Sequence, residues 1–185
     1  MPTLFLIHGS YGHPEENWFP WLKGELEKRG CRVIVPAFPT PEDQNLQNWK
    51  RVLRQDDAAI AKDSIFVGHS LGVAFILRLL ERRKAPVDSA FLVAGFLRPL
   101  GRPEFDIPNV SFLEGHYNWG RIRQVCGHFE VFQSDNDPYV PVACGEELAE
   151  KLGVPLTSVP GAGHFSEKAG YKKFELLLER IVERL

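Results

Sequence analysis

The stretch Ile65–Gly72 constrains the fold of this chain more than any other part of the sequence. It is an apolar run of strand length that ends in Gly68-His69-Ser70-Leu71-Gly72, and an apolar segment with helical periodicity follows directly. This Gly-x-Ser-x-Gly pattern is typical of a nucleophile elbow, a sharp strand-to-helix turn that exposes a serine. Glycine two residues either side of the serine removes side chains that would collide in so tight a turn. The pattern therefore predicts a strand before Ser70 and a helix after it.

Apolar runs of strand length recur six times along the chain and alternate with amphipathic segments. We expect strands at Leu4–Ile7, Cys31–Pro36, Ser64–Gly68, Ser89–Ala94, Phe129–Gln133 and Val154–Val159. Their apolar residues are continuous, which is typical of strands covered on both faces. The helical segments are Trp18–Arg29, Leu46–Ala61, Leu71–Arg83, Val142–Leu152 and Glu167–Leu185. This alternation predicts an α/β fold of three layers, with a mainly parallel six-stranded sheet in the order 2-1-3-4-5-6.

Two segments need a separate interpretation. We expect Ser166 to cap the final helix, whose apolar stripe of Phe174, Leu177, Leu178, Ile181 and Leu185 would face the core. Residues 96–120 contain three prolines and no sustained period, so they predict a long, irregular, lid-like connection, with helix regained near Asn118. No repeat or linker interrupts residues 1–185, which we expect to form one domain.

Composition excludes several classes of partner. A formal net charge of -2 leaves no surplus of basic side chains to neutralise phosphates, so we expect neither nucleic acid nor an anionic membrane surface as a partner. No run of about 18 apolar residues is present, so we expect no membrane span. The apolar run at the N-terminus stops too soon for a signal peptide and reads as a first strand. Nothing indicates an obligate complex, and we expect a monomer or a weak oligomer.

The three cysteines are Cys31, Cys126 and Cys144, which are widely spaced, odd in number and without a Cys-x-x-Cys pair. This pattern argues against a disulfide framework and against a zinc site. We therefore expect buried reduced thiols in a cytoplasmic protein, with no metal and no cofactor.

A serine hydroxyl becomes a good nucleophile only when a base takes its proton and a third group orients that base. In folds that use this elbow the chain order is serine, acid, histidine. Of the histidines after Ser70, His116 lies in the irregular segment and His128 comes just before a strand. His164 lies in a glycine-rich loop between the last strand and the last helix, where its side chain can reach over the sheet edge. We therefore predict that His164 is the base.

Two carboxylates follow the fifth strand, in Ser134-Asp135-Asn136-Asp137-Pro138. We choose Asp137 as the acid because Pro138 fixes the turn that follows it. Asp135 remains an alternative, and Asp106 in the irregular segment is a more distant one. One of the two carboxylates in the turn is expected to make an Asx turn rather than chemistry.

An oxyanion hole needs two preorganised backbone N–H groups. One is expected from Leu71, directly after the serine, and the other from the loop after the first strand, where Gly9 lets the backbone turn. Ser10 is the preferred second donor and Tyr11 the next. This loop lacks the glycine patterns of a phosphate cradle.

We expect His8 and His69 to pack beside these loops rather than to react. Tyr11, Phe96 and Trp119 are predicted to line a substrate pocket, Trp119 because it follows the irregular segment.

Several stretches together resemble the small α/β-hydrolases related to retinoblastoma-binding protein 9 and the bacterial YdeN proteins. The residues that carry the resemblance are Leu6-Ile7-His8-Gly9-Ser10, Glu16-Asn17-Trp18-Phe19-Pro20-Trp21-Leu22, Val35-Pro36-Ala37-Phe38-Pro39-Thr40-Pro41, Gly68-His69-Ser70-Leu71-Gly72, Asp137-Pro138-Tyr139-Val140-Pro141 and Gly163-His164-Phe165. The resemblance runs through nearly the whole chain. It implies a minimal α/β-hydrolase whose Ser, Asp and His triad falls on Ser70, Asp137 and His164.

The sequence departs from this family at two points. Many relatives carry a histidine where Asn17 stands. The Leu-x-Cys-x-Glu signature of the vertebrate member is only approximated by Val142-Ala143-Cys144-Gly145-Glu146, which we expect to begin a helix, so no retinoblastoma binding is inferred.

The function that the sequence predicts is hydrolysis of small esters, thioesters or amides through an acyl-enzyme. The alternatives are a catalytically silent binding protein on the same fold and an acyltransferase, which differs only in excluding water from the acyl-enzyme.

Overall fold

Six strands form one sheet in the order β2-β1-β3-β4-β5-β6 in the computed structural model, which describes residues 1–185. The strands are β1 (Thr3–Ile7), β2 (Arg32–Ile34), β3 (Ile65–His69), β4 (Val87–Val93), β5 (Cys126–Gln133) and β6 (Leu156–Ser158). All five neighbouring pairs are parallel, which confirms the predicted sheet and its order. Ile7 pairs with Gly68 and His69 pairs with Val93, so β1, β3 and β4 end at a common edge. The order reverses between β1 and β3, and a crevice is expected there.

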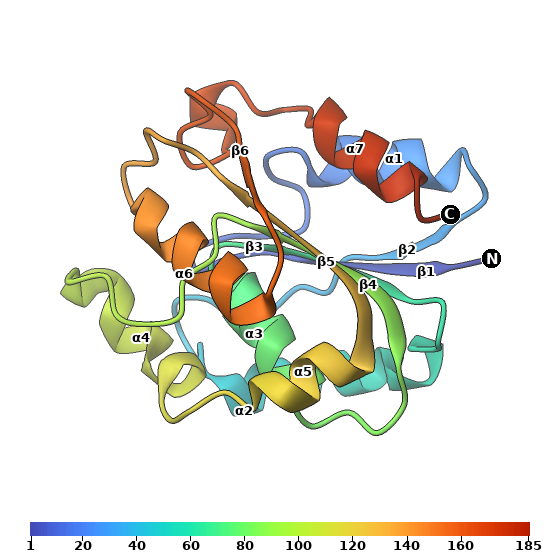
Figure 1. Ribbon diagram of the computed structural model, residues 1–185, viewed down its shortest axis with the longest axis horizontal. Helices are drawn as coiled ribbons and strands as arrows, with labels where there is room; N and C mark the ends of the chain where they lie inside the picture. The colour runs from blue at the N-terminus through green and yellow to red at the C-terminus, as the bar shows by residue number, and fades with distance from the viewer.

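Helices cover both faces of this sheet (Figure 1). Helices α1 (Phe19–Glu27) and α7 (Glu175–Val182) lie together on one face. The other face carries α2 (Leu46–Leu53), α3 (Leu71–Leu80), α4 (Pro103–Leu113), α5 (Trp119–Val125) and α6 (Val142–Leu152). The segment expected as one helix over Leu46–Ala61 divides into α2 and the 3-10 helix η1 (Arg54–Ala59). The chain is thus a three-layer sandwich.

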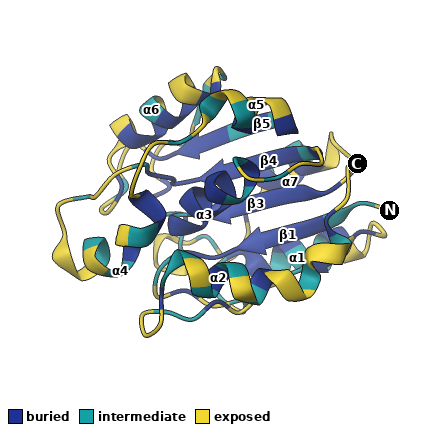
Figure 2. Cartoon of the chain, turned by 90° about the horizontal axis from the view of Figure 1, so that it is seen from below, coloured by how far each residue is buried: buried dark blue, intermediate teal, exposed yellow.

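The core consists of two apolar clusters, one on each face of the sheet. Alternate residues of a strand point to opposite faces, so Leu4 and Leu6 join the α1/α7 cluster while Phe5 and Ile7 join the other. Figure 2 shows the central strands buried from end to end, beneath helices whose outer faces are exposed. Every residue of β3 is buried. Burial on both faces accounts for the continuous apolar runs in the sequence.

The expectation that residues 96–120 are irregular is wrong, because α4 occupies Pro103–Leu113. Proline is tolerated at Pro103, the first helical position, where the missing N–H would have had no partner in the helix. Pro108 lies inside α4 and cannot donate to the carbonyl of Glu104. That carbonyl accepts the Tyr11 hydroxyl instead, at 2.7 Å. A hydrogen bond from a distant loop therefore replaces the bond that the proline removes.

The expected start of the last helix is also wrong. Ser166 precedes only the 3-10 turn η2 (Glu167–Ala169), and its side chain makes no capping hydrogen bond. Gly170 adopts φ of +88°, a left-handed conformation that ends the turn. Helix α7 begins at Glu175, after Phe174, whose ring stacks on Phe165 with centroids 5.1 Å apart. Four apolar residues of the predicted stripe are in the core, whereas Leu185 is 46% exposed.

Arg78 joins α3 to the end of α4. Its side chain is only 6% exposed, and its guanidinium donates to the carbonyls of Phe112, Glu114, Gly115 and His116. The last carbonyls of a helix have no partners within the helix. Glu81 lies 3.4 Å from the guanidinium and supplies the opposite charge, and the Tyr117 ring lies 3.8 Å below it. One buried arginine thus satisfies the C-terminal end of α4.

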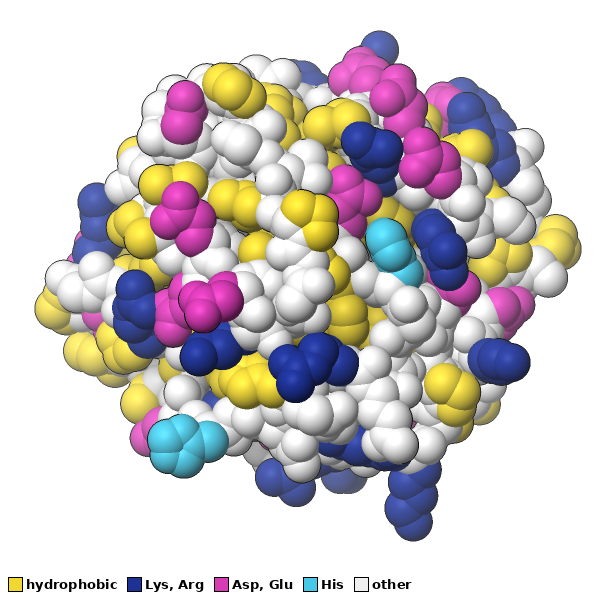
Figure 3. Space-filling view, viewed as in Figure 1, with side chains coloured by type: hydrophobic (Ala, Val, Ile, Leu, Met, Phe, Trp, Pro, Cys, Tyr) yellow, Lys and Arg dark blue, Asp and Glu magenta, His cyan; other side chains and the backbone are white.

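The surface mixes charges of both signs. On the face shown in Figure 3, acidic and basic side chains are interspersed with scattered apolar ones, in keeping with the formal net charge of -2. None of the helices has both the length and the apolar content needed to cross a bilayer.

The tight packing of β1 against α3 gives a first prediction. A Cβ atom on Gly72 would collide with the carbonyl oxygens of Ile7 and His8. Gly72→Ala should therefore lower the free energy of unfolding by about 1–3 kcal/mol, measured by urea denaturation. The control is Gly24→Ala, inside α1 with open space around it, which should raise stability by about 0.5–1 kcal/mol. Equal stability of the two variants would contradict the packing argument.

The Arg78 contacts give a second prediction. Arg78→Met keeps most of the side-chain volume but leaves Glu81 without its buried partner and four carbonyls without a donor. The free energy of unfolding should fall by about 3–5 kcal/mol. Arg82→Met is the matched control, since Arg82 is 76% exposed and 4.0 Å from the same glutamate, and it should change stability by no more than about 0.5 kcal/mol. Similar losses in both variants would show that the carbonyl contacts do not matter.

Candidate active site

Ser70 lies on a strained turn between β3 and α3. Its φ is +55° and its ψ is -121°, a conformation that a residue with a side chain rarely adopts. The Ser70 N–H donates to the carbonyl of Val93 on β4 at 2.9 Å, which ties the turn to the sheet. A Cβ atom on Gly68 would lie 3.0 Å from the backbone of Gly72 and Val73. Gly68 is therefore required by the turn, as the sequence predicts, whereas Gly72 is required by the close approach of β1, where a Cβ atom would meet the carbonyl oxygens of Ile7 and His8.

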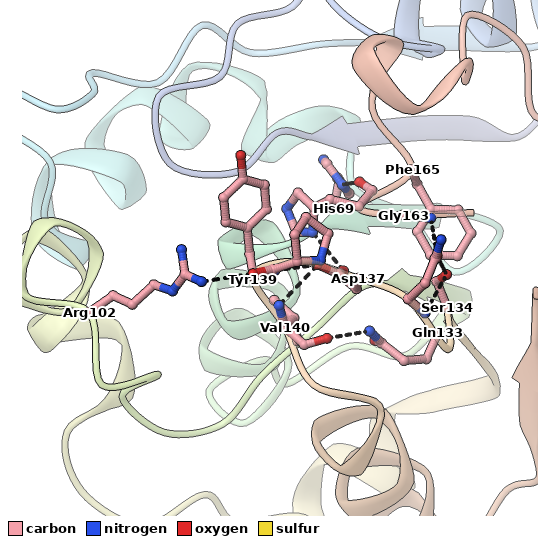
Figure 4. Close-up of polar contacts among 12 residues, drawn as sticks. His69, Arg102, Gln133, Ser134, Asp137, Tyr139, Val140, Gly163 and Phe165 are labelled. Carbon is pink, nitrogen blue, oxygen red and sulfur yellow. Dashed lines mark hydrogen bonds and ion pairs between the residues drawn. The ribbon is translucent and has the colours of Figure 1, made fainter. Parts of the chain in front are cut away.

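The structure brings His164 to Asp137 and not to Asp135. His164 Nδ1 lies 2.8 Å from Asp137 Oδ2, and the Asp137 side chain is fully buried. Asp137 Oδ1 accepts the backbone N–H groups of Tyr139 and Val140, at 2.8 and 3.0 Å (Figure 4). These bonds fix the carboxylate so that its other oxygen faces the imidazole. The Asx turn expected from one of the two carboxylates is made by Asp137 itself.

The alternative acids make structural contacts. Asp135 Oδ1 accepts the N–H of Gly161 at 2.8 Å, which ties the turn after β5 to the loop that carries His164. Asn136 Oδ1 accepts the N–H of Gly163 in the same way at 2.7 Å. Asp106 accepts the N–H groups of Leu100 and Arg102 ahead of α4. Figure 4 also shows Gln133 donating to the carbonyl of Val140, which closes the Asp137 turn from the strand side.

Two ring nitrogens hold the backbone of the His164 loop. His69 Nε2 lies 2.9 Å from the carbonyl oxygen of His164, and Trp18 Nε1 donates to the carbonyl of Phe165 at 3.0 Å. Burial and the neighbouring His164 lower the pKa of His69 to about 3. His69 is therefore neutral at ordinary pH, and we infer that it donates its Nε2 proton to the His164 carbonyl. His69 thus positions the loop.

The loop after β1 lies directly against the serine turn. A Cβ atom on Gly9 would lie 2.8 Å from the Cβ atom of Ser70, so only glycine allows this approach. His8 holds the loop, because its Nδ1 lies 2.8 Å from the Gly9 carbonyl oxygen and its Nε2 accepts the N–H of Phe38. Burial lowers the pKa of His8, which keeps it neutral. His8 and His69 thus have the packing roles expected of them.

Leu71 and Ser10 are the expected oxyanion donors and Tyr11 is the alternative to Ser10; the amides of Tyr11 and Leu71 differ in their partners. The N–H of Tyr11 donates to Thr40 Oγ1 at 2.6 Å, so it is occupied. Leu71 is the first residue of α3, where backbone N–H groups have no partner within the helix.

A cavity of about 740 Å³ joins these residues. Ser10, Ser70 and His164 line it, together with the predicted Tyr11 and Phe96. The prediction for Trp119 is wrong: Trp119 begins α5, packs against Tyr117 and the core, and does not line the cavity.

Sequence reasoning missed several cavity residues. Phe105 and Asn109 are one helical turn apart on α4 and escaped notice because the helix itself was not expected. Tyr139 could have been predicted as a cavity residue, because it lies two residues after Asp137 in the stretch that carries the family resemblance. Its ring meets those of His164 and Phe105 edge to face, with centroids 5.1 and 5.7 Å apart.

The opposite rim of the cavity is more polar. It includes His13, Glu16, Asn17 and Lys168. Partial burial raises the pKa of Glu16, and Asn17 Oδ1 accepts the N–H of Glu167 at 2.8 Å. No group of three or more His, Cys, Asp or Glu side chains is placed to hold a metal ion. The three cysteines are unpaired and buried, and burial raises the pKa of the Cys126 thiol to about 12.

The pKa of His69 gives a third prediction. The unfolded chain binds a proton at this histidine near pH 6.5, whereas the folded protein does so only near pH 3. The stability that His69 contributes is therefore present above about pH 6.5 and is lost as the pH falls toward 3. Between pH 7 and pH 5 this amounts to about 2 kcal/mol of unfolding free energy. His69→Gln keeps an N–H donor and removes the titration, so urea denaturation should show a smaller loss in this variant. An identical loss would contradict the assignment.

Comparison with known proteins identifies the family and the fold. A family model described as serine hydrolase matches residues 4–183. The YdeN protein of Bacillus subtilis is 28% identical over 178 residues, which cover 95% of this chain and 92% of YdeN. Its crystal structure matches with a TM-score of 0.92 at 27% identity, covering 100% of this chain and 98% of that one. The serine hydrolase RBBP9 of Rattus norvegicus is 24% identical over 150 residues, 80% of this chain and 78% of RBBP9.

A more distant structure shares the fold. Est1E from Butyrivibrio proteoclasticus, solved with bound ferulic acid, matches with a TM-score of 0.72 at 16% identity, over 98% of this chain and 90% of Est1E. At 16% identity this match shows the fold alone, whereas the family model identifies the family and spans residues 4–183, including the serine turn, the Asp137 turn and the His164 loop. The chain belongs to the serine hydrolase family.

Proposed function

We propose that this protein hydrolyses small carboxylic esters, thioesters or amides through an acyl-enzyme, with Ser70 as nucleophile, His164 as base and Asp137 as the acid that orients it. The observation that carries the proposal is the 2.8 Å contact between His164 Nδ1 and Asp137 Oδ2 beside a cavity that both Ser70 and His164 line. The family membership supports hydrolysis in general, and the geometry supports these particular roles.

The reaction follows from the protonation states. Asp137 accepts Nδ1–H of His164, which leaves Nε2 free to take the Ser70 hydroxyl proton as Oγ attacks the carbonyl carbon. The carbonyl oxygen becomes an oxyanion, and the intermediate collapses when His164 returns the proton to the leaving alcohol, thiol or amine. Water then attacks the acyl-enzyme with His164 again as base, and the carboxylic acid leaves Ser70 free. No cofactor takes part in any of these steps.

We assign the oxyanion hole to the backbone N–H groups of Leu71 and Ser10. Leu71 offers an unpartnered amide at the start of α3, and Ser10 follows the Gly9 turn that contacts Ser70. Tyr11 is the poorer choice for the second donor because Thr40 occupies its N–H. Each donor in such a hole stabilises the transition state by about 3–4 kcal/mol.

The cavity supports a small substrate. Its volume of about 740 Å³ is within the range of small-molecule sites. Apolar groups come from Phe96, Leu100 and Phe105, so we expect the apolar part of the substrate on the α4 side and polar groups at the opposite rim. We also propose that the protein works in the cytoplasm, since all three cysteines are unpaired, and that it is a monomer or weak oligomer.

A fourth prediction tests Ser70. Ser70→Ala removes the nucleophile and should lower kcat on an activated short-chain ester roughly a million-fold, to the residual rate that binding and the oxyanion hole provide. The same variant should lose covalent labelling by a fluorophosphonate. Ser158→Ala, at an exposed serine on β6, should keep both activities.

The outcomes separate the alternatives. Normal turnover by Ser70→Ala would overturn the proposal. A wild-type protein that is neither labelled nor active would be a silent binding protein. Formation of a new ester or amide from an added alcohol or amine, in place of the free acid, would identify an acyltransferase.

A further inference from the structure

A chain of hydrogen bonds connects α4 to the loop after β1. Ser10 Oγ donates to Asn109 Oδ1 at 2.6 Å, and Gln44 Nε2 donates to the same oxygen at 2.6 Å. Gln44 Nε2 also lies 3.1 Å from Ser10 Oγ. Thr40 Oγ1 donates to Gln44 Oε1 and accepts the N–H of Tyr11. The chain thus begins and ends on the adjacent residues Ser10 and Tyr11.

The two amides at the centre of this network are buried. Asn109 is 1% exposed and Gln44 is 7% exposed, whereas Ser10 and Thr40 are half-buried. Buried polar groups that lack partners are costly, so the hydrogen bonds to Asn109 Oδ1 favour one arrangement of these side chains. Because Asn109 Oδ1 already accepts two donors, it is not free to receive a hydrogen bond from a substrate.

The backbone of the same loop is held from a second direction. The Tyr11 hydroxyl donates to the Glu104 carbonyl that Pro108 leaves without a helical partner. Tyr11 itself has φ of +59°, so this part of the loop adopts a conformation that needs outside support. Helix α4 therefore holds the side chains on both sides of the Ser10–Tyr11 peptide group: Asn109 binds the Ser10 hydroxyl, and the Glu104 carbonyl binds the Tyr11 hydroxyl.

We propose that Asn109 is a positioning residue that acts through Ser10: by holding the Ser10 hydroxyl, it aims the Ser10 backbone N–H at the developing oxyanion. The inference rests on the proposed function and adds a residue from α4 that neither touches the reacting atoms nor belongs to the triad. Gln44 completes the arrangement by fixing Asn109. Helix α4 thereby takes part in building the oxyanion hole, as well as forming a wall of the cavity.

Loss of the contact between Asn109 and Ser10 should weaken binding of the transition state and not binding of the substrate. A misaimed Ser10 amide loses a contact that is strong only when the carbonyl oxygen carries charge. Removal of the Asn109 contact should therefore lower kcat and leave KM unchanged.

The fifth prediction is a set of variants assayed on an activated ester. Asn109→Leu, which removes the acceptor at similar volume, and Ser10→Ala, which removes the donor, should each lower kcat roughly ten- to a hundredfold. The double variant should be no slower than the slower single variant, because both changes break the same contact. Asn109→Asp keeps an oxygen acceptor and should recover most of the lost kcat.

A second measurement tests binding of the oxyanion separately from the rate of the reaction. A trifluoromethyl ketone forms a bond from its carbonyl carbon to Ser70 Oγ, the hydroxyl proton passes to His164, and the ketone oxygen becomes an oxyanion. Affinity for this compound should fall in Asn109→Leu by about the same factor as kcat/KM. Affinity for the carboxylic acid product should not change.

The matched control is Ser111→Ala. Ser111 also lies on α4, and its hydroxyl accepts the N–H of Leu46 at 2.9 Å, so its loss weakens the contact between α4 and α2 without touching Ser10. Its kcat should equal that of the wild type. Urea denaturation of every variant shows whether an activity loss follows from unfolding.

Each outcome decides the inference. An unchanged kcat in a folded Ser10→Ala or Asn109→Leu variant, losses that multiply in the double variant, or an equal loss in Ser111→Ala would overturn it. If Asn109→Leu does not fold, Ser10→Ala gives the same test, because it breaks the same hydrogen bond from the donor side. An inactive wild type would instead refute the proposed function, and this inference with it.

Discussion

The close approach of three backbone segments at Ser70 is the constraint on which the rest of the structure depends. The serine turn, the end of β1 and the start of α3 meet where a Cβ atom on Gly9 or Gly72 would collide with a neighbour. The backbone of Ser70 is held at φ of +55° by these segments, which approach one another so closely that neither glycine has room for a Cβ atom. The sheet order follows from the same requirement, since β1 must lie beside β3 for its loop to reach the serine.

The polar groups around Ser70 are held by partners that do not take part in the reaction. Asp137 is fixed by two backbone amides, and the His164 loop by His69 and Trp18. Preorganised groups of this kind do not have to rearrange as charge develops, which is the main advantage of a buried site over water. The low pKa of His69 fits the proposed mechanism, because a charged imidazole beside His164 would repel the proton that His164 accepts in that mechanism.

The sequence predicts the features that depend on local pattern. The sheet, its order and the serine turn follow from apolar runs and glycine spacing. Chain order and loop position indicate His164, and Pro138 favours Asp137 over Asp135 as its partner. The sequence does not predict α4, because Pro108 is unfavourable within a helix and the compensating donor, Tyr11, is distant in the chain. The same limitation explains why the prediction that Trp119 lines the cavity is wrong. Without α4, the wall of the cavity could not be assigned to Phe105 and Asn109, and an aromatic residue farther along was chosen instead.

Helix α4 therefore changes how the region after β4 should be understood. Arg78 satisfies its C-terminal carbonyls, Ser111 accepts an amide from α2, and Tyr11 and Asn109 bind it to the loop after β1. A lid that opens freely would have to break these contacts together and leave a buried guanidinium and a buried amide without partners, which is costly. The contacts instead favour a fixed wall whose position is transmitted to Ser10. If the proposed oxyanion hole is correct, residues that shape the cavity and a residue that supports the hole lie on one helix, and substitutions on α4 that alter the cavity should also alter the rate.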